Sequence, residues 1–305
     1  MIADEKFSGV LTPVLTPFKK DLKPDVNRFI KQCQWLLSQN VSLAVFGTNS
    51  EANSLAVHEK ISLLNSLVEA GINPNSMMPG TGCCSLTESI ELTSHAINLG
   101  CKGALMLPPF YYKEVSDEGI FRSYSEIIQK IGSEKLKIYL YHIPQVSGVG
   151  LSINLIDRLV NEYPKVIAGI KDSSGDWENI KNILDRQWDD FRVFAGTESI
   201  LLKTMQAGGA GCISATANIN PKAIYNLYKN WVSDQAEELQ IKLNEIRNLM
   251  ESYPMIPALK SVVAYYSRHI EWNIVRPPLV SLKKDSQEEL LQKLDNFGFN
   301  IPGLN

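Results

Sequence analysis

A lysine closes an apolar run in the middle of the chain, where its amine could act as a nucleophile. The run Val166–Lys171 is followed by polar turn residues (172–176), a pattern typical of a buried strand with Lys171 at its carboxyl end. Burial disfavours the ammonium form and leaves some neutral amine, which can attack a carbonyl carbon. For this stretch alone, a lysine whose ammonium reaches solvent from the strand end is the alternative.

The preceding apolar run ends in a tyrosine that could serve the same chemistry. Strand alternation places Tyr139 and Tyr141 on one face, and it places Lys171 on one face with Ile167 and Gly169. We therefore expect Tyr141 and Lys171 to be neighbours on adjacent strands, both facing the interior. A phenol there could transfer protons during carbinolamine formation and dehydration. A packed tyrosine with a hydrogen-bonded hydroxyl is the alternative.

Other polar groups follow predicted strands. The loop Gly47-Thr48-Asn49-Ser50-Glu51 offers backbone N–H groups and a hydroxyl to a carboxylate, although most Gly-Thr turns are only turns. Barrel enzymes carry their sites on the loops after the strands, so these groups are expected at one rim. The other candidate residues that follow predicted strands are Tyr111, Tyr112, Gly196, Thr197 and Glu198.

Short apolar runs alternate with segments of helical periodicity along most of the chain, which indicates parallel strands joined by helices. Eight such strands in succession predict an α/β fold, a (β/α)8 TIM barrel with a C-terminal helical appendage. An open doubly wound sheet is the alternative, but no G-x-G-x-x-G follows the first strand. We expect a barrel domain over 1–225 and a helical region over 226–305. The expected strands are 10–16, 42–46, 77–80, 103–107, 137–142, 166–171, 192–195 and 212–215.

The expected helices divide into two groups. Those between strands include 25–39 with Asp25 as N-cap. Beyond Pro221 the pattern is helical without intervening strands. The between-strand helices are 25–39, 58–70, 86–99, 117–131, 153–162, 177–184 and 199–207, and the C-terminal ones are 221–251, 256–270 and 286–297.

Composition narrows the partners and the compartment. The 305 residues carry a net charge of -3, which gives no reason to expect nucleic acid or a membrane surface. Five scattered cysteines without a C-x-x-C pair predict neither disulfides nor a zinc site, and a reducing cytoplasmic location follows. The four histidines lack metal-ligand spacing, so no metal is expected. The acidic start and the lack of a long apolar run predict a protein that is neither secreted nor membrane-spanning.

Three linked segments resemble one family, the dihydrodipicolinate synthase and N-acetylneuraminate lyase superfamily of pyruvate-dependent class I aldolases. Residues 47–51 are similar to its carboxylate-binding loop. Tyr141-His142-Ile143-Pro144 with Ser147-Gly148 is similar to its tyrosine motif, and residues 169–176 resemble its Schiff-base segment. Order and spacing match over the whole barrel, and the helical tail matches as well.

The resemblance implies a role for each matching residue. Lys171 would form the imine, Tyr141 would relay protons with Thr48 hydrogen-bonded to it, and Tyr112 would be lent to the relay of a neighbouring subunit. The resemblance also implies a homotetramer, a dimer of dimers, with no cofactor beyond the lysine imine of pyruvate. The pyruvate site would comprise backbone groups of Thr48 and Asn49, together with Gly196 and Ile213.

Departures from the family pattern bear on the second substrate. Ser50 replaces the usual loop glycine, Asn49 replaces the usual threonine, and Ala215 stands where a sialic-acid lyase has serine. Val146 stands where dihydrodipicolinate synthases carry the arginine that binds the carboxylate of aspartate semialdehyde, and Val57 and Lys60 replace the histidines of lysine-inhibited synthases.

The lost arginine favours a 2-keto-3-deoxy sugar-acid aldolase, which cleaves a keto-deoxy acid or condenses pyruvate with an aldehyde. Val146, Thr197 and Glu198 are then the candidate contacts to the aldehyde. The alternative is 4-hydroxy-tetrahydrodipicolinate synthase, which uses pyruvate and aspartate semialdehyde in lysine biosynthesis. A non-catalytic keto-acid-binding protein is a more remote alternative.

Overall fold

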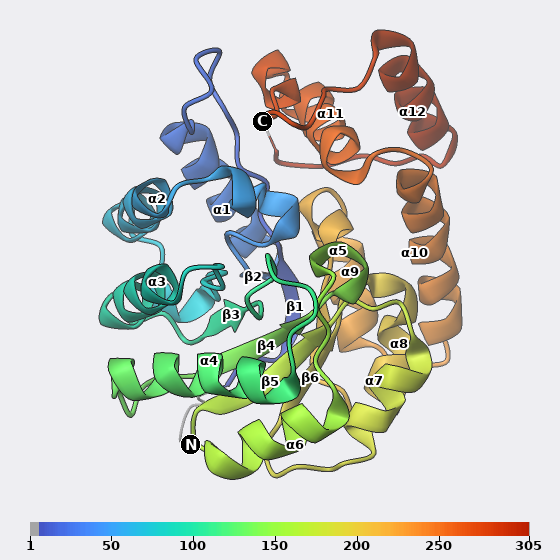
Figure 1. Ribbon diagram of the computed structural model, residues 1–305. Coiled ribbons are helices and arrows are strands. Elements are labelled where there is room, and N and C mark those ends of the chain that lie inside the picture. The colour runs from blue at the N-terminus through green and yellow to red at the C-terminus, as the bar shows by residue number, and fades with distance from the viewer. Residues whose placement is uncertain (1–5, 305) are drawn as a thin grey trace.

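A ring of parallel strands enclosed by helices forms the body of the protein (Figure 1). The computed structural model describes residues 6–304. All strand pairs within the sheet are parallel, as expected for strands joined by crossover helices. The strands are β1 (Gly9–Thr12), β2 (Ser42–Leu43), β3 (Ala104–Met106), β4 (Ile138–His142), β5 (Ile167–Asp172), β6 (Arg192–Ala195) and β7 (Gly211–Ile213).

An eighth extended segment closes the ring. The strand order is β2-β1-β7-β6-β5-β4-β3, and the open edges of β2 and β3 both pair with the segment after the 3-10 turn η3 (Pro74–Ser76). This segment forms parallel bridges Leu43↔Met77 and Gly80↔Leu105. Pro79 has no N–H to donate, which keeps the pairing short. The predicted (β/α)8 barrel is confirmed, with its weakest predicted strand reduced to two bridges.

The barrel interior is filled by apolar side chains, and the helices pack around it. Two further apolar clusters lie between the strands and the surrounding helices. The buried interior cluster consists of Phe7, Leu11, Ala44, Met78, Leu105, Tyr139, Tyr141, Ile143, Ala168, Phe194, Ala210 and Ile213.

An irregularity in β5 changes which residues share the face of Lys171. Tyr139 of β4 pairs with Gly169, while the residue before Tyr139 pairs with Ile167, so Ala168 is an extra residue on β5. Ala168 packs in the barrel interior, whereas Ile167 packs outward beneath the helices. The prediction that Ile167 shares the face of Lys171 is therefore wrong. Such an extra residue shifts the alternation of a strand, and here Lys171 still points inward.

The helices predicted between the strands begin and end close to their predicted bounds, and the short helix α5 (Pro144–Ser147) was not predicted. Asp25 caps the first of them as predicted, because its carboxylate accepts a hydrogen bond from the Arg28 N–H at 2.9 Å. The helices are α1 (Val26–Ser38), α2 (Val57–Glu69), α3 (Leu86–Asn98), α4 (Asp117–Ile131), α5 (Pro144–Ser147), α6 (Ile153–Glu162), α7 (Trp177–Leu184) and α8 (Leu201–Gln206).

The C-terminal helices differ from the prediction in one respect. The expected helix 221–251 is two helices, α9 (Pro221–Lys229) and α10 (Ala236–Glu251), because residues 230–235 include Asn, Ser and Asp that favour turns. α9 packs against β1 as a barrel helix. The predicted domain boundary at 225 falls inside α9, and the division into two parts stays a prediction.

The remaining helices are α11 (Met255–Ser267) and α12 (Lys284–Asn296), and with the upper end of α10 they lie beside one end of the barrel (Figure 1). No helix within residues 6–304 is long and apolar enough to cross a membrane.

A buried ion pair joins this C-terminal region to the barrel. Lys260 of α11 pairs with Glu51, and both side chains are fully buried. Lys260 also donates to the Ile274 carbonyl at 2.8 Å, and Glu51 accepts from the Arg276 N–H at 2.9 Å. Burial lowers the pKa of Lys260 to about 8, and the Glu51 carboxylate opposes that shift. The pair fixes α11 to the loop that follows β2.

Candidate active site

Two neighbouring strands bring a lysine and a tyrosine into contact. Tyr141 of β4 and Lys171 of β5 are paired in the sheet register, as predicted. The Lys171 Nζ donates to the Tyr141 hydroxyl at 3.2 Å and lies 4.3 Å from the centroid of its ring. Only 2% of Lys171 is exposed. An amine and a phenol therefore share one buried corner near the carboxyl ends of the strands.

The loop after β2 adds a hydroxyl to this pair. Thr48 begins the 3-10 turn η1 (Thr48–Ser50), and its Oγ1 lies 3.2 Å from the Tyr141 hydroxyl. Ser50, which departs from the family pattern, stabilises the loop because its Oγ accepts from the Gly47 N–H at 3.1 Å. Its carbonyl accepts from the Thr16 hydroxyl at 2.7 Å. The serine thus holds the turn that presents Thr48.

A cavity of about 540 Å³ opens above these groups. Its lining comes partly from loops after the strands and partly from α10, α11 and the segment between them. Val146 and Thr197, two of the predicted contacts to an aldehyde, are among the lining residues. The wall residues include Thr48, Asn49, Tyr141, Gln145, Val146, Lys171, Ser173, Gly196, Thr197, Ala215, Arg247, Glu251, Tyr253 and Pro254.

Gly196 is a wall residue for which close packing requires glycine. A Cβ at this position would lie 2.1 Å from the Ser173 hydroxyl and 2.7 Å from the Asp172 carbonyl. The Gly196 N–H donates to that carbonyl at 2.6 Å. The Asp172 side chain is also fixed, since it accepts from the Ser174 N–H at 2.7 Å. The residues directly after Lys171 are therefore held by hydrogen bonds and by close packing against Gly196.

Two predicted site residues lie away from the cavity. Glu198 is 1% exposed, and its carboxylate accepts hydrogen bonds from the hydroxyls of Ser214 and Thr216 behind the wall. Ile213 packs inside the barrel, and it is not a wall residue. The structure thus brings Gly196 and Thr197 to the cavity but not these two side chains.

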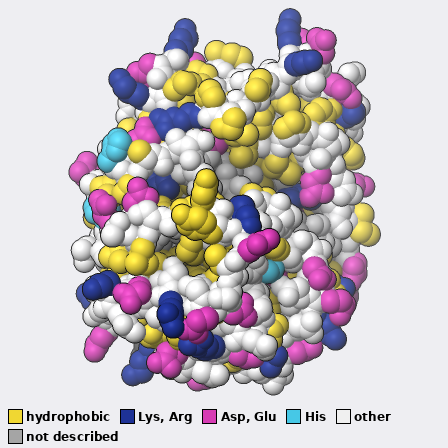
Figure 2. All heavy atoms as spheres, in the orientation of Figure 1, with side chains coloured by type: hydrophobic (Ala, Val, Ile, Leu, Met, Phe, Trp, Pro, Cys, Tyr) yellow, Lys and Arg dark blue, Asp and Glu magenta, His cyan; other side chains and the backbone are white. Residues whose placement is uncertain are grey.

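Tyr112 also lies apart from the place where Tyr141 and Lys171 meet. It is 74% exposed on the loop between β3 and α4, and its ring meets Tyr111 edge-on with centroids 5.3 Å apart. Figure 2 shows hydrophobic side chains projecting over this loop near the middle of the face. Within one subunit Tyr112 does not contact Tyr141.

Sequence reasoning missed a charged wall residue, Arg247 of α10. Its Nε lies 2.7 Å from a carboxylate oxygen of Glu251, and its Nη1 lies 3.4 Å from Glu198. The only sequence signal is the spacing of Arg247 and Glu251, which predicts an ordinary helical ion pair. Only the fold shows that this pair faces the cavity.

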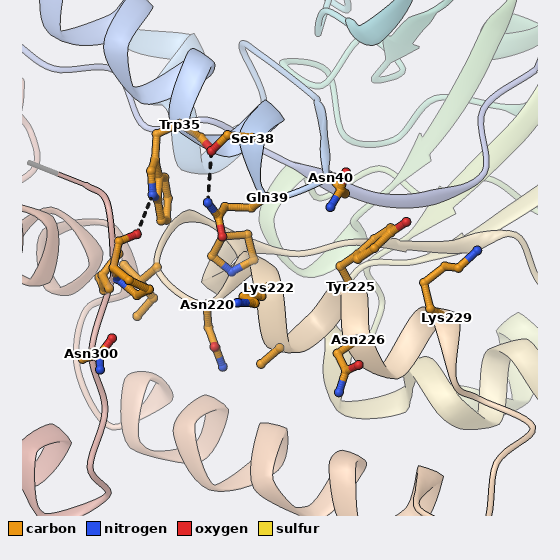
Figure 3. Close-up of a pocket in the computed structure, with 15 residues that line it drawn as sticks. Trp35, Ser38, Gln39, Asn40, Asn220, Lys222, Tyr225, Asn226, Lys229 and Asn300 are labelled. Carbon is orange, nitrogen blue, oxygen red and sulfur yellow. Dashed lines mark hydrogen bonds between the residues drawn. The ribbon is translucent and has the colours of Figure 1, made fainter.

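A second cavity of about 860 Å³ lies between the end of α1, α9 and residues 300–302 (Figure 3). Its walls carry amide side chains and two exposed lysines, Lys222 and Lys229. Trp35 closes one side and donates to the Pro302 carbonyl at 3.1 Å. No buried ionisable side chain lines this cavity, so it is not the candidate active site.

Residues 6–304 contain no group of three His, Cys, Asp or Glu side chains that could hold a metal ion. His142 beside the site is an acceptor, because its Nδ1 receives the Leu151 N–H at 3.0 Å. Burial lowers the pKa of His142, while the charge of Asp172 opposes this shift.

The fold is a closed (β/α)8 barrel with a helical C-terminal region. The Lys171 amine lies near the carboxyl ends of its strands, where enzymes with this fold carry their active sites. The sequence model described as the Dihydrodipicolinate synthetase family matches residues 6–297. The chain belongs to this family, and it is a lyase of the aldolase type.

Individual relatives match over almost their whole length. A protein named as a DapA-like lyase, from Chloroflexus aurantiacus, is 31% identical, with 91% of this chain and 92% of the relative covered. A 4-hydroxy-tetrahydrodipicolinate synthase from Thermodesulfovibrio yellowstonii is 30% identical, with coverages of 96% and 99%. The crystal structure of dihydrodipicolinate synthase from Agrobacterium tumefaciens is 30% identical and superposes with a TM-score of 0.88, covering 96% and 99%.

Proposed function

We propose that Lys171 forms an imine with pyruvate and that the derived enamine adds to an aldehyde, or is released by the reverse cleavage. The carrying observation is the buried contact of the Lys171 amine with the Tyr141 hydroxyl at 3.2 Å. The amine attacks the keto carbon, and Tyr141 supplies and accepts protons as the carbinolamine loses water. The N–H groups of Thr48 and Asn49 begin a 3-10 turn, where they can hold the pyruvate carboxylate.

Borohydride trapping tests this proposal. The protein with pyruvate and borohydride should gain the mass of one reduced pyruvyl group, and peptide mapping should place it on Lys171. Borohydride without pyruvate is the control. An unchanged protein mass would sink the imine proposal.

The second substrate is proposed to be an uncharged polyhydroxylated aldehyde, so that the condensation product is a 2-keto-3-deoxy sugar acid. Val146 offers no charge, and the guanidinium of Arg247 is already paired with Glu198 and Glu251. A second carboxylate would have to compete with these acids for the arginine. Hydroxyls can instead accept from Arg247 and donate to Glu251, and the cavity has ample room for a short polyol.

The alternative is 4-hydroxy-tetrahydrodipicolinate synthase activity, which the names of several relatives at about 30% identity favour. Measuring pyruvate condensation with aspartate semialdehyde and with glyceraldehyde in parallel separates the two proposals. A higher kcat/KM for glyceraldehyde supports the sugar-acid aldolase, and a higher value for aspartate semialdehyde supports the synthase.

Releasing Arg247 from Glu251 should shift this preference. In Glu251→Gln the guanidinium loses its closest carboxylate, and we expect kcat/KM for a carboxylate-bearing aldehyde to rise about tenfold relative to glyceraldehyde, equivalent to about 1.4 kcal/mol. Glu245→Gln, on the exposed side of α10, is the matched control. Equal selectivity in both variants would show that the pair does not select the aldehyde.

Removing the Tyr141 hydroxyl should slow imine formation, while the aromatic ring still fills its place in the site. For Tyr141→Phe we expect the trapping rate to fall by about 10² to 10⁴, the usual share of general acid–base catalysis. Thr48→Val, which keeps the shape of the side chain, should give a smaller loss because the phenol remains. Rapid-quench trapping with borohydride measures both rates. A wild-type rate in Tyr141→Phe would remove the phenol from the mechanism.

A homotetramer with Tyr112 shared between subunits is also part of the proposal. Its support is the 74% exposure of Tyr112, whose ring contacts Tyr111 and does not line the cavity beside Tyr141. The exposed aromatic pair of this loop would then become buried between subunits.

A further inference from the structure

A second buried lysine lies next to the site and has no role in the chemistry so far. Lys60 is on the inward face of α2, and only 4% of it is exposed. Lys171 and Lys260 each have hydrogen-bond partners, but the Lys60 ammonium forms no hydrogen bond or ion pair with any residue of the described chain. The Lys60 nitrogen is not one of the fully buried polar atoms that lack a partner among residues 6–304, so it keeps some accessible surface, and the cavity beside it is one place where it can meet water.

A small cavity connects Lys60 to the Tyr141 corner. Its volume is about 10 Å³, and Lys60, Gly47, Thr48 and Tyr141 are among its walls. That volume is close to the room needed by one water molecule, which also requires two or more polar partners. Thr48 and Tyr141 line the cavity of about 540 Å³ as well, so these two residues lie between Lys60 and the imine site.

We propose that Lys60 is the proton reservoir of this site, exchanging a proton with Tyr141 through the Thr48 hydroxyl and one water in the small cavity. The inference depends on the proposed imine chemistry at Lys171. Lys60 does not touch the substrate and acts only through Tyr141.

A reservoir at Lys60 balances the protons of both steps and keeps Tyr141 protonated between them. When the carbinolamine C–O bond breaks, the nitrogen lone pair forms the iminium, and the hydroxide leaves as water with the Tyr141 proton. The phenolate regains a proton from Thr48, Thr48 from the water, and the water from the Lys60 ammonium. When the methyl C–H bond then breaks to give the enamine, the released proton returns along this chain to Lys60.

The surroundings of Lys60 suit this exchange. Burial lowers its pKa, and the opposing effects of Cys83 and Glu88 are smaller, so the ammonium releases its proton more readily than an exposed lysine does. Cys83, Glu88 and, across the cavity, Tyr141 are the titratable groups that face it. As pH rises through the pKa of Lys60, the ammonium form is lost. Proton supply should therefore fall at a pH below the ordinary lysine value of 10.5.

Exchange of the pyruvate methyl hydrogens in D₂O, followed by NMR, tests the role of Lys60. Lys60→Met should slow exchange by about 100-fold and remove the alkaline fall of the pH profile, while the extent of borohydride trapping at equilibrium is unchanged. Lys60→Arg keeps the charge but cannot release the proton, so it should be equally slow. Lys31→Met, the same change on the exposed face of α1, should match the wild type.

Each result decides the matter. Wild-type exchange in Lys60→Met, or recovery in Lys60→Arg, would overturn the reservoir and leave Lys60 with a charge or packing role only. Methionine replaces a buried charge with an apolar chain, so folding should be retained, and thermal unfolding checks this. If the wild-type protein itself exchanges no methyl hydrogens, the imine proposal at Lys171 fails instead.

Discussion

Replacing Lys171 by methionine should abolish borohydride trapping of pyruvate and lower the rate of aldol cleavage by at least about 10⁴-fold, as expected when a nucleophile is removed. The physical reason is that, among the described residues, no other lysine lines the cavity of about 540 Å³, where the other cationic side chain is that of Arg247. Methionine has a similar length and no charge, so the buried position should accept it. Mass spectrometry and a pyruvate-release assay measure the two effects.

Lys203→Met is the control, because Lys203 is exposed on α8 and packs over the Trp177 ring. It should trap pyruvate like the wild type. A Lys171→Met protein that still released pyruvate at the normal rate would point to a different nucleophile. One that bound keto acid tightly and kept its biological role would favour the non-catalytic binding protein.

Glu51→Gln should lower the free energy of unfolding by about 3 to 5 kcal/mol, because it leaves the Lys260 ammonium buried without its counter-ion. That is a large fraction of the 5–15 kcal/mol typical of a protein domain. Lys260→Met should cost a similar amount, since it strands the Glu51 carboxylate. Urea unfolding followed by circular dichroism measures both.

The double variant Glu51→Gln/Lys260→Met is the informative comparison. It removes both charges, so it should be more stable than the sum of the single losses predicts. Glu59→Gln tests a partly exposed pair with Arg276, and it should cost less than Glu51→Gln. Additive losses at Glu51 and Lys260 would mean that the two groups do not stabilise each other.

The strand-borne part of the site was predictable because the relevant patterns are local. An apolar run that ends in lysine predicts a strand end, and strand alternation predicts that the Tyr141 side chain points inward. The barrel places successive strand ends side by side, and Tyr141 and Lys171 are therefore found 3.2 Å apart. The Thr48 loop was predictable from the family resemblance, and only weakly from its turn residues.

The rest depends on contacts between distant segments, which no local pattern encodes. Glu198 follows a strand like the true wall residues, yet Arg247 and the Ser214 and Thr216 hydroxyls hold it behind the wall. Simple alternation does not predict the extra residue Ala168, which turns Ile167 outward while Lys171 still points inward. Lys60 was visible as a departure from the family, but its proximity to Tyr141 required the folded chain.

The groups proposed for bond making and those proposed for substrate choice come from different parts of the fold. Strands and strand loops supply Lys171, Tyr141 and Thr48, whereas Arg247 and Glu251 come from a helix outside the barrel. Changes in α10 can therefore redirect substrate choice while the bond-making machinery stays intact. A short stretch of the gene is then open to selection, or to a focused mutant library, with little risk to the imine chemistry.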